Sequence, residues 1–236
     1  MGILLRRRKF FIFTNTFLFA VIFVFAAVCF VPGGAVTANG TLPYYYGNRK
    51  SDKISLMFNV YEGEEIVEGI LSVLEEYGAK ATFFVGGCFI DDHAELLEKI
   101  ADGGHEIANH GYFHRDHSAL DEEGNLEEIL NTAKVVKALC GKDMNLFAPP
   151  SGAYGQQTLK AAQNAGYSVV MWSKDTVDWR DSDVKIIEKR ATDGARGGDL
   201  VLMHPKKHTL EALPYILKYY KKAGLVPVTV SENLFG

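Results

Sequence analysis

The sequence predicts an α/β fold in which a parallel sheet is built from repeated strand–helix units. Short apolar, β-rich runs alternate with longer amphipathic stretches about seven times between residues 51 and 236. A glycine follows each of five amphipathic stretches, where a helix favours a left-handed cap residue before the next strand: Gly78, Gly103, Gly141, Gly166 and Gly224. Such a sheet with crossover helices either stays open and doubly wound or closes into a barrel.

The same pattern assigns the elements in order along the chain. The expected strands cover residues 54–60, 81–85, 105–109, 145–148, 168–172, 199–204 and 226–230. The expected helices cover residues 64–77, 94–101, 125–139, 156–165, 184–192 and 209–222. Because polar residues that follow parallel strands collect at one end of the sheet, the strand ends are where an active site is expected.

The composition is that of a globular protein with room for one large domain. The chain has 236 residues, of which 47% are apolar and 23% charged, and its formal net charge is −4. These values argue against disorder, against a collagen-like repeat and against a nucleic-acid binder that depends on net positive charge.

The first 50 residues differ from the rest. Residues 10–31 contain no charged side chain and directly follow three arginines and a lysine at residues 6–9. Twenty-two helical residues span roughly 33 Å, the thickness of a bilayer core, and the cations favour a cytoplasmic amino terminus. We therefore expect a cytoplasmic tip (1–9), a transmembrane anchor (10–31), a linker (32–50) and an extracellular domain (51–236). A cleaved signal remains the alternative, since small residues at 36–38 suit a peptidase, and the domain would then be secreted.

Histidines cluster after the third expected strand. His110 and His114 are four residues apart, so a single helical turn would point both imidazoles the same way, as two ligands of a divalent metal require. His117 and Asp116 are close enough in sequence to contribute. A solvated loop that happens to be rich in histidine is the alternative interpretation.

A second group of polar residues follows two later strands. Asp178 can orient His204 and keep it protonated, which would make a general acid for a leaving amine. Trp179 can form an apolar wall for a sugar face or an acyl methyl group. The turn that contains Pro150 can shape a pocket but carries no reactive group. Taken singly, Asp178 is more often a helix cap and His204 a satisfied histidine at a strand end, but their occurrence together at strand ends favours the acid pair.

Four segments, HGYFH, FAPPSGAYG, WSKDTVDW and LMHP, occur in an order that resembles the polysaccharide deacetylase, or NodB-homology, family (carbohydrate esterase family 4). The resemblance covers roughly residues 55–235. It implies a distorted (β/α)7 barrel that uses a divalent metal, zinc, to remove N-acetyl groups from chitin-like or peptidoglycan sugars. It also implies roles for individual residues: His110 and His114 as metal ligands, Asp178 and His204 as the acid pair, and Trp179 and Leu202 as walls of the acetyl pocket.

The first motif departs from the family pattern. Where the family has Thr-Phe-Asp-Asp-Gly, Asn59 stands at the position of the catalytic base and Val60 at that of the metal carboxylate. Ala148 stands where the family has an arginine that supports the base. An amide accepts no proton at neutral pH and valine binds no cation.

Two functions from different classes follow. The first is a membrane-attached, metal-dependent deacetylase of cell-wall amino sugars at the cell surface, with Glu62, Glu64 or Glu65 supplying the missing carboxylate. The second is a catalytically inactive glycan-binding protein that keeps the fold and the groove. Deacetylation of some other N-acyl substrate is a third possibility. In each case the expected partner is a polysaccharide or a related small molecule, and no nucleic acid is expected.

Overall fold

The computed structural model describes residues 42–236 and confirms the parallel α/β architecture. Its strands pair in the order β5-β4-β3-β2-β1-β7-β6, with β8 beside β1, and every pairing is parallel. The strands are β1 (Lys53–Val60), β2 (Thr82–Val85), β3 (Glu106–Asn109), β4 (Leu146–Phe147), β5 (Ser168–Val169), β6 (Lys174–Asp175), β7 (Leu200–Met203) and β8 (Val226–Pro227). The sheet is a half-barrel rather than a fully closed barrel, because β5 and β6 form its two edges.

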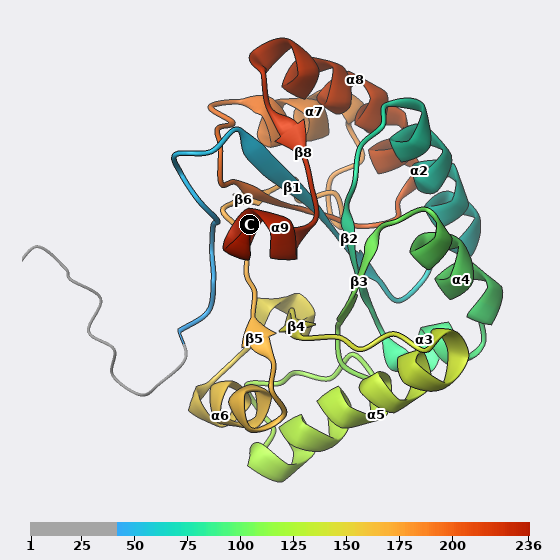
Figure 1. Cartoon of the computed structure of the whole chain (residues 1–236), viewed down its shortest axis with the longest axis vertical. Coiled ribbons are helices and arrows are strands. Elements are labelled where there is room, and N and C mark those ends of the chain that lie inside the picture. The colour runs from blue at the N-terminus through green and yellow to red at the C-terminus, as the bar shows by residue number, and fades with distance from the viewer. Residues whose placement is uncertain (1–41) are drawn as a thin grey trace, which may run out of the picture. The chain divides into compact units, whose positions relative to one another are not determined.

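Helices ring the outside of the sheet, and α9 alone lies over its middle (Figure 1). The helices are α2 (Glu64–Glu76), α3 (Gly87–Asp91), α4 (Ala94–Asp102), α5 (Glu122–Cys140), α6 (Gln156–Asn164), α7 (Val184–Thr192), α8 (Lys207–Ala223) and α9 (Val230–Phe235), with a 3₁₀ turn, η1 (Pro150–Gly152). The short α3 and β6 are absent from the sequence prediction, since each is too brief to show a period.

Alternation along β1 divides the core into two layers. Phe58 and Val60 face outward and join the large apolar cluster between the sheet and the outer helices. Met57 faces inward, toward a smaller cluster that includes Ala148. Because successive strand residues point to opposite faces, Asn59 shares the inner side with Met57. This alternation decides which residues at the end of β1 can reach a site inside the half-barrel.

The segment just before β1 bridges the edge strand β5 and the start of β7. Tyr44 pairs with Val170 and Tyr46 with Asp199, and the amide of Tyr44 donates to the Val169 carbonyl at 2.8 Å. Within the predicted linker, 32–50, these two tyrosines therefore pair with the sheet, because extended backbone satisfies open groups beside β5 and β7. The predicted tip and membrane segment, 1–31, lie outside the described residues. Within residues 42–236 no helix has the length and apolar character needed to cross a membrane.

The carboxyl terminus closes the end of the half-barrel opposite the strand carboxyl ends. The expected strand 226–230 is wrong beyond Pro227, because the Thr229 hydroxyl accepts from the Glu232 amide and starts α9 instead. The amide of Val230 donates to the Thr82 hydroxyl at 2.8 Å. A β-branched run thus contains a helix cap that outweighs its strand propensity.

Four of the five expected glycine caps are confirmed. The residues that follow the helices with positive φ are Gly78, Gly141, Gly166 and Gly224, at 62°, 70°, 80° and 72°. After α4 the expected residue, Gly103, has φ −65°, and its neighbour Gly104 takes the left-handed conformation with φ 70°. The error is one residue within a Gly-Gly pair, which a periodic pattern does not resolve.

Candidate functional site

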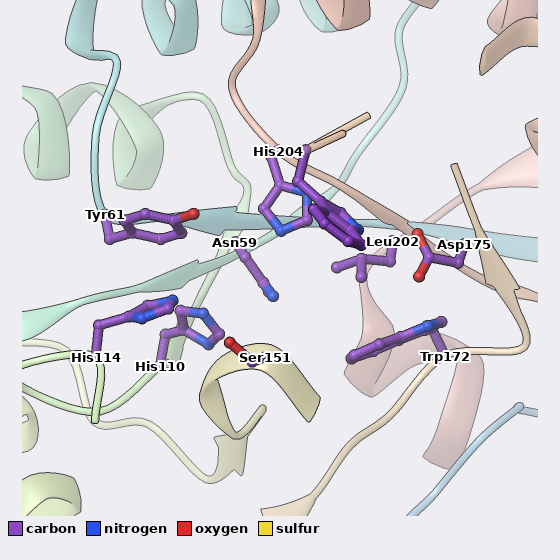
Figure 2. Close-up of a pocket in the computed structure, with 10 residues that line it drawn as sticks. Asn59, Tyr61, His110, His114, Ser151, Trp172, Asp175, Leu202 and His204 are labelled. Carbon is purple, nitrogen blue, oxygen red and sulfur yellow. The ribbon is translucent and has the colours of Figure 1, made fainter. Parts of the chain in front are cut away.

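A pocket of about 300 Å³ opens at the carboxyl ends of the strands. Figure 2 shows side chains from the ends of several strands converging on it. Its lining consists of Asn59, Tyr61, His110, His114, Ser151, Trp172, Asp175, Trp179, Leu202 and His204. The predicted wall residues Trp179 and Leu202 are among them, with Trp179 55% exposed at the rim. Pro150 is not, because it lies buried in η1 and its neighbour Ser151 reaches the pocket instead.

The acid pair is complete. Asp178 is 1% exposed, and its Oδ1 accepts from Nδ1 of His204 at 2.7 Å. Its Oδ2 accepts from the His204 amide at 2.7 Å and from the Thr209 hydroxyl at 2.6 Å. Burial alone raises the pKa of Asp178, but the hydrogen bonds from His204 and Thr209 outweigh it and hold that pKa below its ordinary value. The carboxylate therefore stays charged and fixes the His204 ring, which lines the pocket. We name Asp178, His204 and Thr209 the acid wall.

The two metal-type histidines are brought together by a loop, not by the helical turn expected from their spacing. Gly111 and His114 both have positive φ, 76° and 56°, so the chain doubles back and places the two imidazole centroids 5.2 Å apart. The buried carboxylate of Glu128 holds this loop, because its Oε2 accepts from the amides of Tyr112 and Phe113 at 2.8 Å each. A left-handed histidine is strained, and the Glu128 contacts offset that strain.

His110 is held in one neutral form. Its Nδ1 donates to the Ala148 carbonyl at 2.7 Å, which leaves the other ring nitrogen with a free lone pair. Burial, and after it the nearby His114, lowers the pKa of His110 to about 3. Burial also lowers the pKa of His114. Both rings are therefore uncharged near neutral pH.

The other two candidates in this cluster lie elsewhere. His117 is buried and its Nδ1 bonds to the Asn125 side-chain oxygen at 2.7 Å. Asp116 accepts from the amide and hydroxyl of Ser118 at 2.9 and 2.6 Å. Neither residue lines the pocket.

The residues at the end of β1 differ in the side they face. Asn59 lines the pocket at 3% exposure, and its Oδ1 has no hydrogen-bond partner among the described residues. Val60 is fully buried on the opposite face, in the apolar layer beneath the outer helices. The methyl group of Ala148 belongs to the inner apolar cluster, so no cation stands beside Asn59 from that position.

Tyr61, which the sequence interpretation did not single out, occupies the position at which the resembled motif has glycine. Its ring centroid lies 4.2 Å from that of His114 and 6.2 Å from that of His110. Figure 2 shows its hydroxyl end directed past Asn59 toward His204. Burial, with a contribution from Glu62 that Lys206 opposes, raises the pKa of Tyr61, so the hydroxyl remains a donor. We name Asn59, Tyr61, His110 and His114 the histidine wall.

Three further lining residues, Ser151, Trp172 and Asp175, were also missed. Ser151 and Trp172 come shortly after β4 and β5, and Asp175 is the last residue of β6, so the rule that sites lie at strand ends was the signal that could have found them. Asp175 Oδ1 accepts from the amide of Val177 at 2.7 Å. Its carboxylate is therefore partly engaged in shaping the turn before Asp178.

None of the three glutamates expected to replace the missing carboxylate lines the pocket. Glu62 forms an ion pair with Lys206, and Glu64 lies 3.5 Å from Nε2 of His93. Glu65 is exposed at the start of α2. The expectation that one of these glutamates supplies the carboxylate inside the pocket is therefore wrong.

The residues present do not fit a divalent metal. A catalytic zinc site uses three protein ligands, and here the histidine wall supplies two imidazoles, an amide and a phenol ring packed against one of the imidazoles. Among residues 42–236 no group of three or more His, Cys, Asp or Glu side chains is placed to hold a metal ion. The expected zinc centre thus lacks its third ligand.

Comparisons with known proteins agree with this site. The polysaccharide deacetylase family model matches residues 46–170. The chain is 33% identical over 190 residues to the uncharacterized protein YlxY of Bacillus subtilis, an alignment that covers 80% of this chain and 60% of YlxY. It is 36% identical over 171 residues to a peptidoglycan-N-acetylglucosamine deacetylase of Bacillus cereus, covering 70% of this chain and 80% of that protein.

Among solved structures, a CE4 family pseudoenzyme from Bacillus anthracis superimposes with a TM-score of 0.79 at 28% identity, covering 82% of this chain and 69% of that one. A mutant of the same pseudoenzyme is described as having restored enzymatic activity, and it superimposes equally well. The family match, the acid wall and the pocket at the strand ends lead to one conclusion: the chain belongs to the polysaccharide deacetylase family.

Proposed function

We propose that this protein is a non-hydrolysing member of its family that binds N-acetylated cell-wall glycan in the pocket. One observation carries the proposal: Asn59 occupies the buried position from which a base would act, and its amide takes up no proton at neutral pH. Without a base or a completed metal site, water is not activated for attack on an acetamide.

The pocket retains what binding a sugar requires. Trp179 at the rim and Trp172 inside offer aromatic faces, and Leu202 offers an apolar wall. Polar groups from both walls converge on the same space. A site that has lost hydrolysis therefore still matches an amino sugar in shape and polarity.

The names of the similar proteins support a peptidoglycan-type ligand. One relative is a peptidoglycan-N-acetylglucosamine deacetylase, and another is a peptidoglycan-N-acetylmuramic acid deacetylase of Bacillus subtilis, 32% identical over 199 residues. The structural similarity to a pseudoenzyme supports the loss of turnover. We further propose that residues 10–31 anchor the domain at the outer face of the membrane, where such a glycan is found.

The test measures binding and hydrolysis in the same sample. The full-length chain, purified in mild detergent, is titrated with tetra-N-acetylchitotetraose, and released acetate is assayed with zinc or cobalt added. We expect saturable binding and no acetate above the protein-free blank. Acetate release by the unmodified protein would contradict the proposal.

A second candidate function, active deacetylation, is favoured by the intact acid wall. The 2.7 Å bond between Asp178 and His204 is the arrangement that a leaving amine needs for protonation. This candidate requires a carboxylate that the described pocket lacks beside the two histidines. The acetate assay separates the two functions directly.

A further inference from the structure

We propose that Asn59 and Tyr61 together form a metal-independent recognition site for the intact N-acetyl group of an amino sugar. This inference rests on the proposed function, because a site that hydrolysed the group would not retain it. It assigns a binding role to the two pocket residues that separate this chain from the deacetylase motif.

Asn59 presents a carboxamide where the family motif has a carboxylate. A carboxylate only accepts hydrogen bonds, whereas a carboxamide both donates and accepts. An acetamido group carries one N–H donor and one carbonyl acceptor, so it is the complement of a carboxamide. Asn59 is 3% exposed, lines the pocket, and has an Oδ1 without a partner among the described residues. An unpartnered buried oxygen is costly, and rotation of the carboxamide about its Cβ–Cγ bond turns Oδ1 toward the pocket, where a ligand N–H satisfies it.

Tyr61 packs beside the two imidazoles. Its ring lies against that of His114, with centroids 4.2 Å apart, and so fills space next to the two histidines that the glycine of the family motif leaves open. Figure 2 shows the hydroxyl end of Tyr61 directed toward the space between Asn59 and His204. A phenol hydroxyl there is a neutral donor for the acetyl carbonyl, in the part of the pocket where the family would polarise that carbonyl with a metal.

The lining of the pocket also favours an acetylated sugar over a deacetylated one. The remaining atoms of the acetyl group, a methyl and its carbon, meet the apolar surfaces of Leu202 and Trp172. A deacetylated sugar presents an ammonium group instead, which needs a nearby carboxylate. Among the described residues that line the pocket, Asp175 alone has one, and Figure 2 shows it on the far side of Leu202 from Asn59 and Tyr61. The pocket is therefore built for the acetylated sugar and against the free amine.

The experiment compares two probes by calorimetry on the full-length chain in detergent with EDTA present. The probes are tetra-N-acetylchitotetraose and the fully deacetylated glucosamine tetramer. We expect the unmodified protein to prefer the acetylated probe at least tenfold, without metal. Equal affinity for the two probes, or binding that appears only when zinc is added, would overturn the inference.

Two variants test the named residues. Tyr61→Phe keeps the ring and removes the hydroxyl, and it should weaken the acetylated probe about fivefold, the effect of one uncharged hydrogen bond. Asn59→Asp should weaken the acetylated probe and strengthen the deacetylated one. Trp179→Ala, which removes a rim contact, is the control and should weaken both probes by the same factor. Thermal melting confirms that each variant is folded.

The outcomes separate this inference from the proposed function. Acetate released in a parallel sample that contains zinc or cobalt in place of EDTA would overturn the proposed function. Acetylated-probe binding without acetate, but with a ratio unchanged by Tyr61→Phe and Asn59→Asp, would overturn only the inference. A loss of preference in both variants, with the control keeping it, supports the inference.

Discussion

The two walls of the pocket have diverged to different degrees, although both are built at the carboxyl ends of the same sheet. The acid wall keeps a buried carboxylate with three hydrogen-bond donors on it, two from His204 and one from Thr209. The histidine wall keeps its imidazoles but has an amide at Asn59 and a ring at Tyr61. Asp178 also links its own loop to His204, directly after β7, and to Thr209 in α8. The acid wall therefore contributes to the stability of the fold as well as to the site.

This difference indicates that a substitution in the acid wall costs more folding free energy than one in the histidine wall. Removing Asp178 would strand buried donors, which is costly whatever the protein does. An asparagine at position 59 leaves a single buried oxygen without a partner among the described residues. A valine at position 60 packs in the apolar layer and leaves no buried polar atom there. A site can therefore lose its base and metal ligand while the fold keeps its acid pair.

The largest expected effect is a gain of metal binding when the histidine wall is returned to the family motif. In Val60→Asp/Tyr61→Gly, the substitution removes the ring that packs against His114, and the glycine lets the end of β1 change its backbone direction, so the new carboxylate can join the two imidazoles. We expect zinc binding with a Kd of about 1 μM or tighter, equivalent to about 8 kcal/mol, against none for the unmodified chain. Calorimetry with zinc measures it. Adding His114→Ala should abolish the gain, and equally tight binding by the unmodified chain would contradict the account.

The next effect tests the structural role of the acid wall. Asp178→Ala leaves the His204 amide and the Thr209 hydroxyl without their buried acceptor, so we expect a loss of about 4 kcal/mol in the free energy of unfolding. Urea unfolding of the full-length chain measures it. Asp175→Ala, which loses one backbone contact at the pocket edge, should cost about 1 kcal/mol and serves as the matched control. Equal losses would show that the acid wall has no special part in stability.

A smaller effect tests which way the end of β1 faces. Val60→Asp alone, with Tyr61 still in place, puts a carboxyl group into the apolar layer and should cost about 3 kcal/mol. Asn59→Asp changes the neighbouring residue on the pocket side and should cost about 1 kcal/mol. Denaturant unfolding compares the two variants. If both cost the same, the two side chains do not point to opposite faces.

The smallest effect is in the pH dependence of stability, where His117, in the loop after β3, and Asp178, in the acid wall, should respond in different ranges. Burial lowers the pKa of His117, although Asn125, Glu128 and Asp116 act against it. The unfolded chain then binds more protons than the folded one, so this contribution to stability is present above about pH 6.5 and is lost as the pH falls below it.

Asp178 also has a lowered pKa, so its contribution is present above about pH 4 and is lost only below that value. Unfolding free energies measured from pH 3.5 to 7.5 should therefore fall less steeply below pH 6.5 in His117→Asn than in the unmodified chain. A slope should remain, because the pKa values of His105, His110 and His114 are also lowered by burial. Asp178→Asn should keep the unmodified slope between pH 6.5 and 4.5. A His117→Asn profile parallel to that of the unmodified chain would exclude His117 as a source of the dependence.

The repeating pattern of the sequence predicted much of the fold. Apolar runs and amphipathic stretches placed the main strands and helices because burial on a sheet or a helix face leaves a regular period. Short elements escaped for the same reason: β6 has two residues and α3 has five. Thr229 turned an expected strand into a helix, since a local cap competes with strand propensity in a way that periodicity does not register.

The sequence by itself determined the chemistry available at the strand ends: the acid pair, the two histidines, and the absence of carboxylates at positions 59 and 60. Only the tertiary structure decided how these residues are used. The face of β1 puts Asn59 in the pocket and Val60 outside it, the left-handed His114 brings the imidazoles together, and the Tyr61 ring packs against His114. The physical reason is that residue identity fixes which protons and lone pairs exist, whereas strand alternation and loop geometry fix where they point.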